Sequence, residues 1–143
     1  MPPHLDNNLR LSFCPSVLLS LCAFKLMKRT LVVDDVAINR KLAVALLKKR
    51  GWVSEEADDG QAALDQLSEA PFDHVLLDIS MPGMDGEGVC RRIRANPAWA
   101  GLRVVAYTAH AMESDKQRLL GVGFDYVLVK PITIQALLLA LPE

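Results

Sequence analysis

Residues 29–34 read RTLVVD and residues 73–78 read DHVLLD, two short apolar runs that each end in an acidic residue. A continuous apolar run without alternating polar positions is typical of a strand buried on both faces, as in a parallel sheet covered by helices. Further strands are predicted at residues 52–57, 102–108 and 125–129. The chain therefore predicts five strands, most of them buried.

Segments with helical spacing of apolar residues separate these strands, at residues 39–50, 59–67, 85–94, 112–120 and 133–141. Gly51 is expected to end the first helix, and Gly121 and Gly123 to end the fourth, while Asp59 is expected to cap the second. Strands and helices that alternate with short loops predict an α/β fold, a doubly wound five-stranded parallel sheet with helices on both faces.

The composition limits the classes of protein that the chain can represent. Its 143 residues suit one domain, and 16 basic against 17 acidic residues give a net charge of -1. A dedicated nucleic-acid binder would show a strongly basic face, so no direct nucleic-acid partner is expected. The cysteines, Cys14, Cys22 and Cys90, form no CxxC pair. We therefore expect no disulfide framework or zinc site, and a reduced, cytoplasmic protein.

The first 27 residues differ from the rest of the chain, and we divide it into an N-terminal extension at 1–27 and a domain at 28–143. Residues 11–27 are mostly apolar but contain Pro15 and Lys25, and they fall short of a spanning helix. Three interpretations stay open: a miscalled start with Met27 as the true first residue, a segment that packs on the domain, and a membrane anchor. The first is favoured, because Met27 leads directly into the first strand.

Polar residues that could bind ligands or take part in a reaction gather where the predicted strands end. Asp34 and Asp35 follow the first strand, Asp78 ends the third, Thr108 ends the fourth and Lys130 ends the fifth. The carboxyl ends of parallel strands share one edge of a sheet, where ligands bind. If the strand order is 2-1-3-4-5, the first and third strands are neighbours and the three carboxylates converge.

Three converging carboxylates repel one another and need a compensating cation. Mg²⁺ prefers oxygen ligands and often keeps waters and phosphate oxygens in its shell. We expect Asp34 and Asp35 to hold Mg²⁺, one directly and one through water, and Asp78 to be the nucleophile that forms an aspartyl-phosphate. The ammonium of Lys130 and the hydroxyl of Thr108 would then stabilise the phosphoryl oxygens.

Four segments, LVVDDVAINRKL, VLLDISMPGMDG, VVAYTAHA and VLVKPI, resemble in order and separation the signature segments of response-regulator receivers, especially those of hybrid kinases and phosphorelays. The resemblance covers residues 28–141 and implies a flavodoxin-like fold. It also implies Mg²⁺ bound by Asp34, Asp35, Asp78 and the backbone carbonyl of Ser80. Thr108 would be the switch hydroxyl and Lys130 the phosphate-binding lysine. A cis peptide bond would precede Pro131.

Two positions depart from the pattern of the family. An aromatic switch residue often stands three positions before the lysine, where this chain has Val127. Tyr126 is one residue earlier and is expected to point to the other face of its strand. Ser80 and His110 occupy positions where the family tunes dephosphorylation, and their effect on the phosphoryl lifetime does not follow from the sequence.

By this likeness the chain is expected to accept a phosphoryl group from a histidine kinase or a histidine phosphotransfer protein. It would be mainly a signalling switch that catalyses its own phosphorylation and dephosphorylation, with output through altered protein binding to an unnamed target. A phosphorylation-dependent dimer is one such output. The chain is alternatively a receiver fragment of a hybrid histidine kinase. An aspartate-nucleophile phosphatase is disfavoured, because its D-x-D motif would need an acid where Ser80 stands.

The remaining conspicuous residues are interpreted as structural. Trp52, Trp99 and Tyr107 are expected to be packing residues, and Cys90 to be a buried or half-buried helix residue. The basic run at residues 48–50 is expected to be a solvated helix end, which suits the helix dipole.

Overall fold

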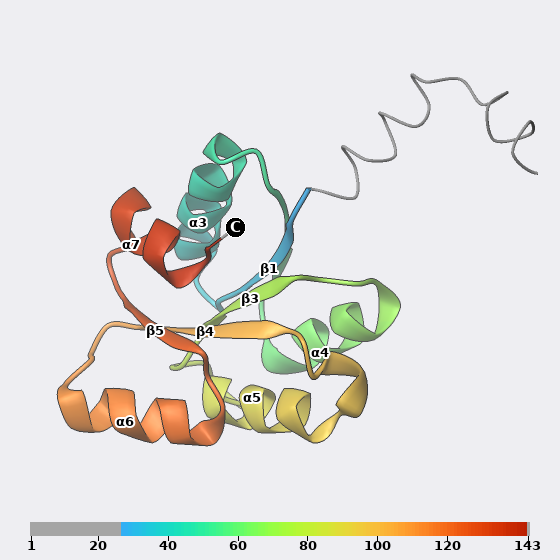
Figure 1. Ribbon diagram of the computed structural model, residues 1–143, viewed down its shortest axis with the longest axis vertical. Coiled ribbons are helices and arrows are strands. Elements are labelled where there is room, and N and C mark those ends of the chain that lie inside the picture. The colour runs from blue at the N-terminus through green and yellow to red at the C-terminus, as the bar shows by residue number, and fades with distance from the viewer. Residues whose placement is uncertain (1–26, 143) are drawn as a thin grey trace, which may run out of the picture.

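A parallel sheet of five strands forms the centre of the domain (Figure 1). This computed structural model describes residues 27–142, so the predicted extension at 1–27 lies outside the described residues except for Met27. The strand order is β2-β1-β3-β4-β5, as predicted. The strands are β1 (Arg29–Val33), β2 (Val53–Ala57), β3 (His74–Asp78), β4 (Arg103–Thr108) and β5 (Tyr126–Val129).

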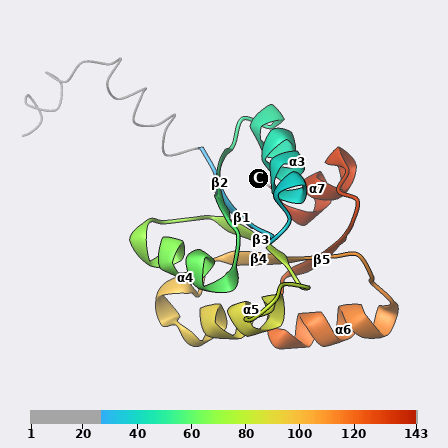
Figure 2. The same ribbon diagram turned by 180° about the vertical axis from the view of Figure 1, so that it is seen from behind.

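Helices cover both faces of the sheet, which confirms the predicted doubly wound, flavodoxin-like architecture. One face carries α3 (Ala37–Lys49) and α7 (Ile134–Ala140); the other carries α4 (Gly60–Glu69), α5 (Gly86–Ala95) and α6 (Glu113–Val122) (Figure 1, Figure 2). A 3-10 helix that the sequence did not predict, η1 (Pro97–Trp99), joins α5 to β4. Across residues 27–142, every helix is too short or too polar to cross a membrane.

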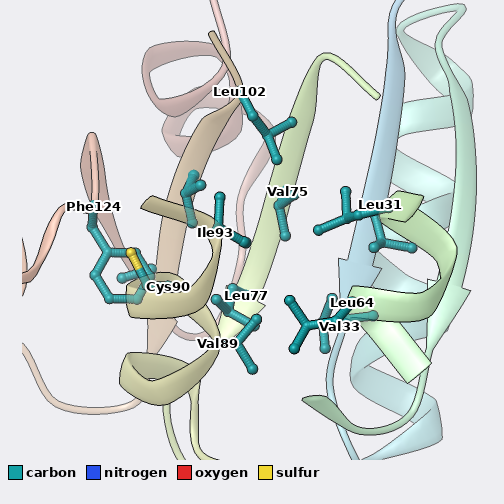
Figure 3. Close-up of a cluster of buried hydrophobic side chains, with 14 of the residues drawn as sticks. Leu31, Val33, Leu64, Val75, Leu77, Val89, Cys90, Ile93, Leu102 and Phe124 are labelled. Atoms are coloured by element: carbon teal, nitrogen blue, oxygen red, sulfur yellow. The ribbon is translucent and has the colours of Figure 1, made fainter. Parts of the chain in front are cut away.

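Two apolar clusters lie on the two sides of the sheet. In β3, Val75 and Leu77 pack with Cys90 of α5 in the cluster under α4, α5 and α6 (Figure 3). Leu76 points to the other side and packs with Leu137 of α7. Successive strand residues alternate between faces, so a strand covered on both sides must be apolar throughout. This explains why the strand reads as a continuous apolar run, and Cys90 is buried as predicted.

The helix boundaries follow local capping chemistry. Asp59 accepts a hydrogen bond from the Ala62 N–H at 2.7 Å, which confirms its predicted role as a cap. Helix α3 begins at Ala37, two residues before the predicted start. Of the two glycines expected to end α6, Gly121 lies inside the helix, whereas Gly123 follows its last residue and has a φ of 127° that favours glycine.

The last turn of α3 is less solvated than its basic sequence predicts. The two lysines are exposed, but the Arg50 guanidinium lies 3.8 Å from the centre of the Trp52 ring and donates a hydrogen bond to the Leu141 carbonyl. Trp52 stacks in turn on His74, with ring centroids 4.9 Å apart. The expectation of a solvated helix end is therefore wrong for Arg50, which ties α3 to the end of α7.

Gly86 is expected to be essential to the packing of α5 against β3. A Cβ at this position would lie 2.3 Å from the carbonyl oxygen of Asp78 and 2.8 Å from the Cα of Ile79. Because both are backbone atoms, we expect Gly86→Ala to lower the free energy of unfolding by about 1–3 kcal/mol in urea titrations. A control is Gly121→Ala in α6, where an added Cβ would have no atom within 4 Å apart from its chain neighbours and its own helix backbone. Equal stability of Gly86→Ala and the parent protein would contradict this packing.

His74 is expected to make the fold sensitive to acid. Burial lowers its pKa from 6.5 to about 4; the charge of Asp73 acts in the opposite direction, and nearby basic residues add smaller lowering contributions. Between those values the unfolded chain binds a proton that the folded chain does not, so stability falls as the pH falls, by up to about 1.4 kcal/mol per pH unit. We expect His74→Phe, which keeps a ring for stacking on Trp52, to flatten this dependence in urea titrations between pH 7 and 4. If the stability of His74→Phe and that of the parent protein fall in parallel with pH, His74 is not the cause of the acid sensitivity.

Candidate functional site

Three carboxylates converge at the carboxyl edge of the sheet. Asp34 and Asp35 follow β1 and Asp78 ends β3, and each has an oxygen within 4.8 Å of the others'. Asp34 and Asp78 are 0% and 2% exposed, whereas Asp35 is open to solvent. The sequence predicted this convergence from the order of the strands, and β1 and β3 are indeed paired neighbours.

The backbone around these acids holds the two buried carboxylates. The Val36 N–H donates to Asp34 Oδ1 at 2.8 Å, and the Ser80 N–H donates to Asp78 Oδ1 at 3.2 Å. The Asp34 N–H donates to the carbonyl of Ala57 in β2 at 3.2 Å. Each buried acid is thus oriented by the first residues of the loop that follows its own strand.

Lys130 brings a positive charge to the same edge from the end of β5. Its Nζ lies 3.1 Å from Asp78 Oδ1 and 3.3 Å from Asp34 Oδ2. The lysine is aligned by its backbone N–H, which donates to the Thr108 carbonyl at 2.8 Å. Its ammonium also lies 4.7 Å from the centre of the buried Tyr107 ring, a favourable cation–π arrangement. The Lys130–Pro131 peptide bond is cis, as expected.

The charges at this edge are unbalanced. Three carboxylates cluster here, and the ammonium of Lys130 pairs with only two of them, Asp34 and Asp78. The pKa of Asp78 is raised, first by burial and then by the charge of Asp34. The Lys130 ammonium and the Ser80 N–H act in the opposite direction. A hard divalent cation would restore the balance, and carboxylate oxygens are the ligands that such ions prefer. The donor set therefore fits a divalent metal.

Comparison of the sequence with known protein families supports the assignment of a functional site at this edge. A model of the family described as the response regulator receiver domain matches residues 30–142, most of the chain. The chain belongs to the response regulator receiver family. It is a receiver of two-component and phosphorelay signalling, with an acidic pocket in the place that its fold predicts.

The receiver is similar to parts of larger proteins. It is 42% identical over 108 residues to the signal transduction histidine-protein kinase BarA of Escherichia coli K12, covering 76% of this chain and 12% of BarA. It is 45% identical over 107 residues to the sensor histidine kinase RcsC of Salmonella typhi, covering 75% of this chain and 11% of RcsC. The chain thus spans a small part of the length of either kinase.

A solved receiver has a similar fold. The receiver domain of the sensor histidine kinase PA1611 from Pseudomonas aeruginosa PAO1 superposes with a TM-score of 0.71 and 28% identity, covering 78% of this chain and 91% of that one. That structure has a magnesium ion coordinated in its active-site cleft.

Thr108 of the receiver is turned toward its own loop. Its hydroxyl donates to the His110 carbonyl at 2.9 Å and accepts from the His110 N–H at 3.1 Å. Within residues 27–142, no hydrogen bond joins the Thr108 hydroxyl to Asp78 or to Lys130. The structure therefore brings Thr108 to the predicted edge but leaves its hydroxyl engaged by the residue two positions later.

The strand that carries Lys130 has the alternation that the sequence predicts. Val127 packs toward the cluster under α4, α5 and α6, whereas Tyr126 packs toward the cluster under α3 and α7. Tyr126 therefore does not replace the aromatic residue that many receivers carry at the position of Val127. Ser80 lies two residues after Asp78, and the expected use of its carbonyl as a metal ligand stays a prediction.

Sequence reasoning missed two contacts of the site. Tyr107 was expected only to pack, yet its ring also faces the Lys130 ammonium; strand alternation places it on the lysine's side of the sheet. Arg40 had no expected role, yet its Nη1 donates to the Asp34 carbonyl at 2.7 Å. The signal for Arg40 was its position one turn into the helix that follows the acidic pair.

Charge substitutions are expected to move the pKa of Asp78 in opposite directions. Asp34→Asn removes the nearest like charge, so the pKa of Asp78 should fall. Lys130→Met removes the ammonium that favours the ionised form, so it should rise. Carboxyl-carbon NMR titration of the metal-free receiver measures both. A change in the same direction for both variants would refute this account of the pocket.

Proposed function

We propose that the receiver accepts a phosphoryl group on Asp78 from the phosphohistidine of a histidine kinase or a histidine phosphotransfer protein. The observation that carries the proposal is the setting of Asp78. Its carboxylate lies 3.1 Å from the Lys130 ammonium and within 4.8 Å of carboxylate oxygens of Asp34 and Asp35. This gives an incoming phosphoryl group a nucleophile, an ammonium donor and a place for a counter-ion.

Mg²⁺ is the proposed counter-ion. Asp34, Asp35 and Asp78 would hold it, together with the backbone carbonyl of Ser80. Support comes from the clustered oxygen donors, from the unbalanced negative charge, and from the magnesium ion in the cleft of the PA1611 receiver. When bound, the ion neutralises charge on the phosphoryl oxygens.

The residues of the chain have separate tasks in this transfer. A carboxylate oxygen of Asp78 forms a bond to phosphorus while the phosphorus–nitrogen bond of the phosphohistidine breaks. The electron pair of that bond returns to the imidazole, which leaves as neutral histidine once it carries a proton. Lys130 donates to a phosphoryl oxygen from its place beside Asp78. Attack by water on the acyl phosphate, or transfer to another histidine, returns Asp78 to its ionised form.

Thr108 links the chemistry to output. Its hydroxyl is bonded to His110, so donating to a phosphoryl oxygen on Asp78 requires it to leave that carbonyl. The loop between β4 and α6 would then have two arrangements, and the phosphoryl group would favour one of them. We infer that output is a changed protein-binding surface near this loop, used by a target protein or by a second receiver in a phosphorylation-dependent dimer.

The relatives suggest the setting of the receiver. Its likeness to segments of BarA and RcsC supports a place in a phosphorelay, either as a separate receiver or as the receiver part of a hybrid histidine kinase. We also propose a cytoplasmic location. Histidine kinases make phosphohistidine from ATP, which is a cytoplasmic substrate, so the receiver must meet its phosphodonor there. A phosphatase of the aspartate-nucleophile class is not favoured, since Ser80 stands where its second acid would be.

Phosphorylation can be tested directly. Incubation with a small-molecule phosphodonor and Mg²⁺ should add one phosphoryl group to Asp78, stable in acid and labile in base, as seen by intact-protein and peptide mass spectrometry. Asp78→Asn should abolish the gain, and chelation of Mg²⁺ should suppress it strongly.

A matched control is Asp65→Asn, which alters an exposed carboxylate on α4 and should leave phosphorylation unchanged. A phosphoryl group that persists in Asp78→Asn, or the absence of any gain in the parent receiver, would defeat the proposal.

A further inference from the structure

Arg40 connects three parts of the molecule around the acidic pair. It projects from the first turns of α3, and its Nη1 donates to the Asp34 carbonyl at 2.7 Å. Its Nε donates to Glu56 Oε1 on β2 at 3.1 Å. The Arg40 side chain is only 15% exposed. The guanidinium is therefore held between the strand that flanks β1 and the loop that carries two of the three acids.

The atom that Arg40 contacts controls the direction of Asp35. The Asp34 carbonyl belongs to the peptide unit that joins Asp34 to Asp35, and that unit is planar. A bond that fixes the carbonyl therefore fixes the plane from which Asp35 departs. Within residues 27–142, no hydrogen bond or ion pair of the Asp35 carboxylate is found, so its position depends on its backbone.

We propose that Arg40 is a positioning residue for metal binding: it orients the Asp34–Asp35 peptide so that both carboxylates can meet Asp78 around one cation. Glu56 would hold the guanidinium in place for this task. The inference rests on the proposed function, because it presumes that the acidic cluster binds Mg²⁺.

Lys41 shows what an ordinary ion pair at the same place looks like. Its Nζ lies 2.8 Å from Glu56 Oε2, and its side chain is 69% exposed. It touches the same glutamate as Arg40, but no contact joins it to the Asp34–Asp35 loop within residues 27–142. Exposed pairs of this kind contribute little. Lys41 is therefore a matched control that differs from Arg40 in the contact under test.

The direction in which Mg²⁺ affinity changes when Arg40 is replaced distinguishes a positioning role from a simple charge effect. Removing a positive charge near a dication site should strengthen Mg²⁺ binding if charge alone matters. Removing a positioning residue should weaken it, because the ligands lose their alignment. Loss of an outer partner of a metal ligand typically lowers affinity about 10–100-fold. Arg40→Met therefore has opposite expected results under the two accounts.

The experiment is calorimetric titration of the full chain with Mg²⁺. We expect Arg40→Met to raise the dissociation constant about tenfold, Arg40→Lys to have an intermediate effect, and Lys41→Met to leave affinity unchanged or slightly stronger. In phosphorylation with a small phosphodonor, the Mg²⁺ concentration for half-maximal rate should rise by the same factor in Arg40→Met. The maximal rate at saturating Mg²⁺ should stay close to that of the parent.

Several outcomes would overturn the inference. Unchanged or tighter Mg²⁺ binding by Arg40→Met would show that Arg40 acts only through its charge. Equal losses of Mg²⁺ affinity in Arg40→Met and Lys41→Met would show that the effect comes from losing any ion pair with Glu56, not from the contact with the Asp34 carbonyl. Thermal melting without metal shows whether each variant folds; if Arg40→Met does not, Arg40→Lys decides the question. Failure of the parent receiver to bind Mg²⁺ would instead overturn the proposed function, and the inference with it.

Discussion

Repulsion among buried carboxylates is the constraint on which the rest of this receiver depends. Asp34 and Asp78 are almost fully removed from water at the end of two adjacent strands, where ionised groups are costly unless compensated. Lys130 offsets part of that cost through contacts of 3.3 and 3.1 Å. The remaining imbalance gives the pocket its chemistry, because a cation or a donor that enters it meets charge that the fold has not neutralised.

The scaffold keeps this arrangement by close packing around the acids. Parallel pairing places Val33 of β1 beside Leu77 of β3, so the residues that follow each strand emerge side by side. Gly86 then lets α5 approach the backbone of Asp78 more closely than any side chain would permit. The acids are therefore held by rigid elements on two sides, which suits phosphoryl transfer because it depends mainly on positioning.

The sequence predicted the strands, their order and the residues gathered at the edge of the sheet, because these follow from local runs and from the geometry of parallel strands. It could not predict contacts between distant segments. Arg50 looked like a solvated helix end but reaches Leu141, 91 residues away. Two glycines were expected to end α6, and only the structure shows that Gly123, with its positive φ, does so while Gly121 stays helical. The contact between Tyr107 and Lys130 required knowledge of how β4 and β5 align.

An acidic pocket of this kind works against the stability of the domain that contains it. The raised pKa of Asp78 means that its ionised form is less favourable here than in water, so the folded state carries an electrostatic cost at neutral pH. The two apolar clusters must supply the stability that the pocket removes. A ligand that neutralises the pocket binds the folded chain in preference to the unfolded one and therefore stabilises it. The repulsion among the carboxylates therefore lowers the stability of the metal-free domain and raises its affinity for a cation. A substitution that reduces this repulsion stabilises the metal-free domain and weakens its attraction for a cation.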